Sequence, residues 1–174
     1  MFSIPDAEAE DGPDRIFTRL LMSHGELREL AEMMESGVTL RFLMRSGEWT
    51  KGGRTIWGTC YLADQGFQGP LKDLAVQLLD DMLGALPHFL VVLSDDWWQE
   101  ATPLEREVLV FHEVLHAGHA KDRYGEPRFN RETGDPIICI QPHDVEEFDA
   151  VVARYGTWSP DLERFAAALD RGRK

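Results

Sequence analysis

Long apolar runs, basic residues and cysteines are all scarce in this chain of 174 residues. No apolar run approaches the roughly 18 residues of a transmembrane helix, so we expect no membrane contact. The first residues, MFSIPD, lack the basic and apolar regions of a secretory signal. Cys60 and Cys139 are too few and too far apart for a disulfide framework. Together these absences favour a reducing, cytoplasmic location.

The scarcity of basic residues argues against nucleic acid as a partner. Eighteen Lys and Arg stand against 31 Asp and Glu, which gives a formal net charge of −13. A domain that binds a duplex needs a basic face, so we expect no nucleic-acid binding by the protein itself. Two explanations of the acidity stay open: a solvated surface that keeps the protein dispersed, or a DNA mimic.

What is present is the composition of a globular domain, with 43% apolar and 10% aromatic residues. We interpret residues 1–12 as a flexible acidic arm and residues 13–174 as a single domain, because no repeat or long linker divides them. The hydrophobic periodicity predicts helices over 14–36 (bent near 23–26), 71–84, 103–118 and 144–156, and strands over 38–44, 55–62 and 89–94. The first two strands are expected to pair as an antiparallel hairpin, and residues 94–98 to form a turn.

The helix expected over 103–118 carries the chemistry. Thr102 can cap it, Pro103 suits its first position and Glu105 can close a capping box. From residue 108 to residue 118 its only polar side chains are His112, Glu113 and His116. A helix so apolar is typical of a buried one. Burying these three groups costs several kcal/mol, about 2–7 for each polar group, unless they are paired or bind a metal.

Residues 112–116 form an HExxH motif. Side chains four residues apart lie side by side on a helix, so His112 and His116 can bind one zinc ion. Glu113 lies one helical step away and is the expected general base, which takes a proton from a water that the metal acidifies. His119, three residues further on, is a poor ligand because Gly118 favours the end of the helix; we expect His119 in the terminal turn, facing the helix dipole.

A catalytic zinc site needs a third protein ligand. Glu147 is the first choice, because it borders the apolar face of the helix expected over 144–156. Glu147 could instead close a capping box with Asp144. His143 is the alternative third ligand, and Asp144 could then orient a ligating histidine.

These segments resemble the phage metallopeptidase family. The resemblance rests on FLVVL at 89–93, a tryptophan at 97 or 98, HEVLH at 112–116, HDVEEF at 143–148 and the basic hairpin at 51–54, and it spans about residues 38–158. It implies a compact zincin fold, related in plan to SprT-like and ImmA/IrrE-type peptidases, and a phage or bacterial source. It also implies His112 and His116 as ligands, Glu113 as base and a third ligand from 143–148. His119 is followed by AKDR, which disfavours the metzincins.

We therefore expect an α+β, zincin-like domain in which a mainly antiparallel sheet packs on the HExxH helix and on a second, ligand-bearing helix. The expected function is zinc-dependent hydrolysis of peptide bonds, with one Zn²⁺ per chain and a protein or peptide as substrate, in the cytoplasm of a bacterial host or phage-infected cell. The alternative is a catalytically silent zinc-containing protein, or an acidic interaction protein that acts as a DNA mimic or inhibitor. Residues 89–93 form either a core strand or a strand that pairs with substrate. Tyr124, Tyr155 and His119 are candidates to stabilise the oxyanion.

Overall fold

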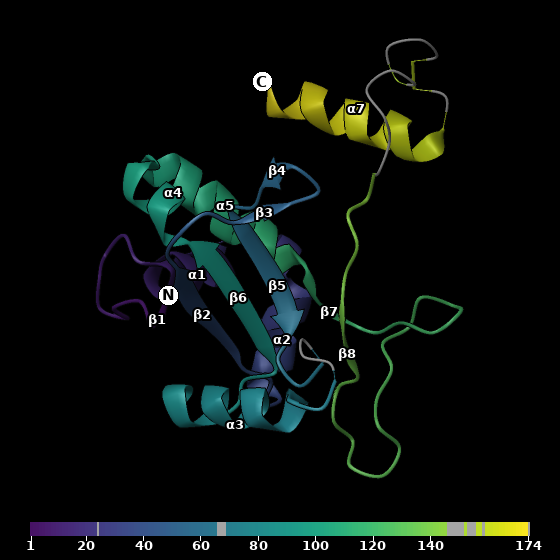
Figure 1. The fold of residues 1–174 in the computed structure, drawn as a ribbon. Coiled ribbons are helices and arrows are strands. Elements are labelled where there is room, and N and C mark those ends of the chain that lie inside the picture. Colours follow the sequence, from purple (N-terminus) through teal and green to yellow (C-terminus); the bar gives the residue numbers. More distant parts are fainter. Residues whose placement is uncertain (24, 66–68, 146–151, 153–155, 158, 174) are drawn as a thin grey trace. The chain divides into compact units, whose positions relative to one another are not determined.

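The computed structural model describes residues 1–23, 25–65, 69–145, 152, 156–157 and 159–173 (Figure 1). The chain divides into two compact units, Met1–Gln141 and Pro142–Lys174. Among the described residues, no helix is both long enough and apolar enough to cross a membrane.

The first unit has a mixed α+β fold. Its helices are α1 (Pro13–Ser23), the 3₁₀ turn η1 (Gly25–Leu27), α2 (Arg28–Glu35), α3 (Lys72–Leu83), α4 (Asp95–Glu100) and α5 (Pro103–Leu115). Its strands are β1 (Phe2–Ser3), β2 (Leu40–Arg45), β3 (Thr50–Lys51), β4 (Arg54–Thr55), β5 (Gly58–Leu62), β6 (Phe89–Ser94), β7 (Ala117–His119) and β8 (Ile138–Ile140). The α+β class and the bend between α1 and α2 are confirmed.

The main sheet has four strands in the order β1-β2-β6-β5. The pairs β1–β2 and β5–β6 are antiparallel, but β2 and β6 run parallel over six residue pairs, so the sheet is mixed. The predicted hairpin between the second and the fifth strand is therefore wrong, because β6 lies between them. Every residue of β6 is buried, and a strand without a polar face is stable only in the interior of a sheet. An antiparallel hairpin does form in the segment between β2 and β5, but it consists of the two short strands β3 and β4.

Helices cover both faces of this sheet (Figure 1). On one face, α1, α2 and α5 pack on β2 and β6 around Phe17, Phe42 and Val91. On the other face, α3 packs through Leu79 on a smaller apolar cluster that includes Leu90. Helices thus shield both faces of the sheet from solvent. Helix α5 contacts β5, the edge strand.

Local signals account for the ends of two helices. Gly84 ends α3 with a φ of 78°, the left-handed conformation that a residue without a Cβ adopts at little cost. The predicted turn after β6 is instead the short helix α4, whose N-cap is Ser94: the Ser94 side chain accepts a hydrogen bond from the backbone N–H of Trp97. The sequence prediction missed this cap because Ser94 also ends the strand.

The chain turns back after α5 through strands β7 and β8, which pair antiparallel. His119 therefore lies in a strand and not in a terminal helical turn; its side chain is buried, and its Nε2 lies 2.8 Å from the Arg128 carbonyl oxygen. In the second unit, α7 (Pro160–Gly172) begins at the N-cap Ser159 with a proline in its first turn. The sequence analysis did not predict α7. Most of the helix expected over 144–156 lies outside the described residues.

Candidate metal centre

The capping box that begins α5 is present. The Thr102 side chain accepts a hydrogen bond from the backbone N–H of Glu105, and the backbone N–H of Thr102 donates to the Glu105 carboxylate at 2.8 Å. These bonds satisfy two backbone donors at the end of the helix, so α5 begins at a defined residue. The register of the motif in the next turns follows from this fixed start.

Only one face of α5 is buried, through Leu109, Val110 and Val114. On the other face Leu104 and Val108 are 70% and 59% exposed, so the prediction of a helix buried on all sides is wrong. The prediction failed because exposed apolar residues are common in folded proteins. The sequence pattern alone cannot distinguish a buried helix face from an exposed apolar one. The open face is the one that carries the motif histidine His112, which is exposed.

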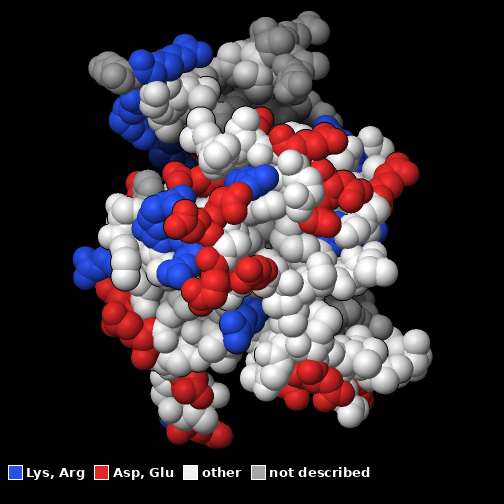
Figure 2. Space-filling view, turned by 90° about the vertical axis from the view of Figure 1, so that its left-hand side faces the viewer, with Lys and Arg blue, Asp and Glu red and all other residues white. Residues whose placement is uncertain are grey.

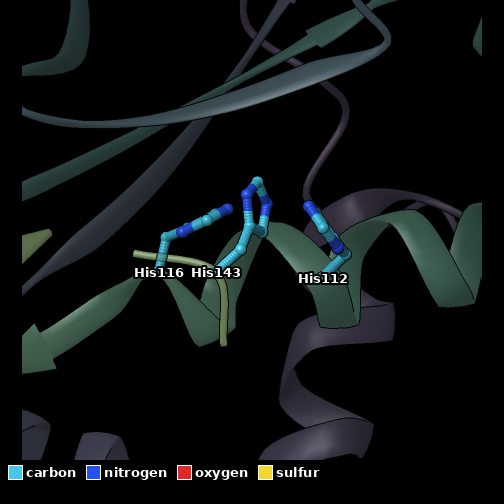
Figure 3. A group of neighbouring side chains, drawn as sticks. All are labelled: His112, His116 and His143. Atoms are coloured by element: carbon cyan, nitrogen blue, oxygen red, sulfur yellow. The ribbon is translucent and has the colours of Figure 1, made fainter. Parts of the chain in front are cut away.

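His112 and His116 lie one helical turn apart and on the same side of α5 (Figure 3). Their ring centroids are 5.2 Å apart, with the rings nearly perpendicular. His112 is exposed and His116 is half-buried, so solvent and solutes can reach the pair. The i, i+4 spacing places the two imidazoles as the motif requires.

The β7–β8 pairing brings Gln141 to His116. The Gln141 N–H donates to the His116 carbonyl at 2.8 Å, and His116 Nδ1 lies 2.6 Å from the Gln141 carbonyl oxygen. A carbonyl can only accept, so Nδ1 carries a proton, and Nε2 is the ring nitrogen left to bind a metal. The sequence analysis missed this role of Gln141, because a backbone contact between distant residues leaves no side-chain signature.

His143 follows Gln141 by two residues, a length of chain that spans at most about 7 Å. Its ring lies between those of His112 and His116 in Figure 3, and one ligand atom from each of the three lies within 4.8 Å of the others. Glu147, the other candidate ligand, lies outside the described residues, as does Tyr155. Asp144 is described and exposed, and Tyr124 is 72% exposed.

Glu113 points away from solvent and is 4% exposed. Burial raises the pKa of its carboxyl to about 7, and a hydrogen bond from the Cys60 backbone acts in the opposite direction. A carboxyl with a pKa near neutrality can accept and release a proton at physiological pH. The same environment raises the pKa of the Cys60 thiol to about 12, through burial and the nearby Glu113 charge, so this thiol stays protonated.

Two glycines allow the close approaches around the centre. A Cβ on Gly58, the first residue of β5, would lie 2.7 Å from the Glu113 carboxylate oxygen Oε1. A Cβ on Gly118 would lie 2.3 Å from the Gln141 side chain. Gly58 was missed from the sequence, although an isolated glycine in a strand pattern is a known signal of close packing.

The donor set fits a metal ion. Three imidazoles within reach of one point, with one tautomer fixed by a backbone carbonyl, are a common ligand arrangement for zinc and other transition metals. The buried carboxyl of Glu113 follows His112 directly, and both residues line the same pocket.

The comparisons with known proteins agree with this chemistry. No curated protein and no solved structure gives a significant match to the chain. One family pattern, described as "Putative phage metallopeptidase", matches residues 6–170, nearly the whole chain. The chain belongs to this family of phage metallopeptidases.

Proposed function

We propose that the protein is a zinc-dependent peptidase in which His112, His116 and His143 hold the metal and Glu113 is the general base. The observation that carries this proposal is the position of the buried Glu113 carboxyl directly after one of three clustered imidazoles. Membership of a metallopeptidase family supports the same reaction and a protein or peptide substrate.

The ligand chemistry favours zinc. Three neutral nitrogen donors suit a borderline-soft divalent ion, whereas calcium and magnesium prefer oxygen donors. With three protein ligands, a tetrahedral ion keeps one position for water or substrate. Glu147 remains the alternative third ligand, since it lies on the segment that follows His143.

Zinc bound here would supply Lewis acidity, which acidifies a water molecule and polarises the carbonyl of the scissile bond. Glu113 would accept the proton of the attacking water. It would then return that proton to the leaving amine, so the carboxyl ends in its starting state.

A substrate strand cannot pair with β6 as one of the sequence interpretations supposed. Both edges of β6 are occupied, by β2 and by β5. The strand that contacts α5 at the end of the sheet is β5, which begins at Gly58 against Glu113. A substrate segment that pairs with the sheet beside Glu113 would therefore pair with β5.

The alternative function is a silent zinc protein or an acidic interaction protein. A structural site needs only ligands, and a buried carboxyl without a role would cost stability. The position of Glu113 therefore favours an enzyme.

The test is the variant Glu113→Gln. It keeps the size of the side chain and removes the basic carboxylate, so zinc content and melting temperature should stay near those of the wild type. Cleavage of peptide libraries should fall by about 10²–10⁴-fold. A chelator should abolish the wild-type activity, and added zinc should restore it.

Equal inertness of both forms on peptide libraries and on host lysate, scored by new protein N-termini, would contradict the peptidase. Capture of the same partner by both forms would then favour the interaction protein. Zinc at the same level in the wild type and in His116→Ala would contradict the metal centre itself.

A further inference from the structure

An open apolar pocket adjoins the candidate centre. His112 and Glu113 line one side of it, and Trp57, Trp97, Leu104 and Val108 are among the other lining residues. Its volume is about 560 Å³, and all of its lining residues belong to the first unit. The proposed base Glu113 and one proposed ligand, His112, therefore share a cavity with an apolar wall.

Two stacked tryptophans form part of that wall. The rings of Trp57 and Trp97 lie 5.4 Å apart at an angle of 17°. Trp97 belongs to α4, which the Ser94 side chain caps, and the Trp57 carbonyl accepts a hydrogen bond of 2.7 Å from the Ser94 N–H. Both backbones are thus tied to the same residue, so the stack is held in place before any ligand binds.

The wall is apolar and accessible. Trp57 is 50% exposed and is not among the residues of the unit's main apolar core. Leu104 and Val108 project from the open face of α5 beside it. Apart from Glu113, the carboxylate among the pocket residues is Glu105, which is engaged in the capping box of α5.

We propose that this pocket binds a large apolar side chain, preferably aromatic, next to the scissile bond of the substrate. A rigid aromatic wall gives such a side chain a flat surface to stack on, and burial of apolar area supplies the affinity. A charged side chain would lose its hydration against this apolar wall. The inference rests on the proposed peptidase and adds its substrate class.

The experiment uses the zinc-loaded full chain and acetylated peptides that are identical except for one position, occupied by Phe, Leu, Ala or Asp. Mass spectrometry locates the cleaved bond, and kcat/KM is measured for each peptide. Four proteins are compared: wild type, Trp57→Ala, Val108→Phe and the control Trp49→Ala. Trp49 is half-buried and lines a different pocket, beside α3. Trp49→Ala is therefore the same Trp-to-Ala change as Trp57→Ala, made outside the proposed binding pocket.

We expect the wild type to cleave next to Phe or Leu with a kcat/KM at least about ten-fold above that for Ala. Trp57→Ala should lower the kcat/KM for the Phe and Leu peptides toward that for the Ala peptide, and so remove most of the preference. Val108→Phe fills the pocket and should shift the preference toward Ala. Trp49→Ala should keep the wild-type preference, and melting temperature and zinc content should show that each variant is folded and loaded.

Zinc-dependent cleavage with equal rates for all peptides, or with a preference that Trp57→Ala leaves intact, would overturn the pocket and leave the peptidase standing. If no peptide is cleaved, the proposed peptidase activity is contradicted. The proposed pocket is then tested by peptide binding instead of cleavage. The Phe peptide should then bind Glu113→Gln more tightly than the Ala peptide by calorimetry, and Trp57→Ala in that background should remove the difference. Equal binding of the two peptides would overturn the inference.

Discussion

The absence of a side chain at Gly58 leaves the space that the Glu113 carboxyl occupies. Gly58 begins β5, and the position of its absent Cβ is within 3 Å of three atoms of the Glu113 side chain. Any larger residue must displace the carboxyl or the strand. The same contact excludes water from that side of Glu113, which supports the burial that raises its pKa.

We expect Gly58→Ala to lower kcat/KM by at least about ten-fold, since a small misplacement of a catalytic group costs that much or more. Overpacking should also lower the free energy of unfolding, by about 1–3 kcal/mol. Zinc content should stay near wild type, because the three atoms nearest to this Cβ position all belong to Glu113 and none to an imidazole. Kinetics, urea unfolding and elemental analysis on one preparation would measure all three.

Gly25→Ala is the matched control, because a Cβ on Gly25 meets nothing within 4 Å. It should leave activity and zinc unchanged. Full activity in Gly58→Ala would show that Glu113 need not occupy the position described.

The identity of the third ligand is also a question of single residues. Two hydrogen bonds tie Gln141 to His116, and His143 follows after only one intervening residue. We expect His143→Ala to weaken zinc binding by at least about ten-fold, whereas Glu147→Ala should bind zinc as wild type does. Competition with a chromophoric chelator measures both affinities, and Glu146→Ala serves as a neighbouring control.

The reverse result, with zinc lost from Glu147→Ala and retained by His143→Ala, would assign the ligand to Glu147. A capping role of Glu147 would appear instead as about 1 kcal/mol of lost stability with zinc retained.

At the scale of the element, α5 combines a capped N-terminus with an exposed side that carries the metal-binding motif. Its capping box fixes the first turn, its buried side packs on the sheet, and its other side presents the histidine pair. The Thr102 hydrogen bonds also hold the pKa of Glu105 below its usual value. A depressed pKa in the folded state means that this stabilisation is present above the unfolded pKa and is lost as the pH falls through the folded one.

Loss of the N-cap in Thr102→Ala should destabilise the protein by about 1 kcal/mol at neutral pH. The difference from wild type should shrink in acid, where Glu105 becomes protonated. Urea unfolding at pH 7 and below pH 4 measures the change. Thr18→Ala is the control, because the Thr18 hydroxyl donates to the Asp14 carbonyl within α1 and caps no carboxylate among the described hydrogen bonds. A difference independent of pH would show that Glu105 does not contribute through its charge.

At the scale of the whole molecule, charge decides which partners can approach. On the face drawn in Figure 2, Lys and Arg side chains lie among Asp and Glu side chains across the middle of the view. Several basic residues of the first unit are engaged with carboxylates, in the pairs Arg15–Glu8, Arg19–Glu107, Arg28–Glu32, Arg106–Asp11 and Lys121–Glu29. Such pairing reduces the cationic surface that a phosphate backbone could contact.

The protein should not bind duplex DNA by itself. A net charge of −13 repels a polyanion, and the repulsion should grow as salt is removed. Gel-shift or fluorescence-anisotropy measurements over a range of salt concentrations would detect binding. A complex that strengthens as salt falls would contradict this prediction.

The sequence alone determined the features that depend on local spacing. The i, i+4 histidines, the capping box at Thr102 and the buried strand at 89–94 could be predicted, because each requires only neighbours along the chain. The bend between α1 and α2 belongs to the same class, since a capping signal near residues 23–26 predicted it.

Tertiary structure decided what depends on residues far apart. Only the fold places β6 between β2 and β5, presses Gly58 against Glu113 and brings Gln141 to His116. It also leaves Trp57 and Val108 exposed beside the site, although their residue types suit a core equally well. The physical reason is that strand order and burial follow from packing of the whole chain, and an apolar residue contributes to the core or to an open pocket with the same local pattern.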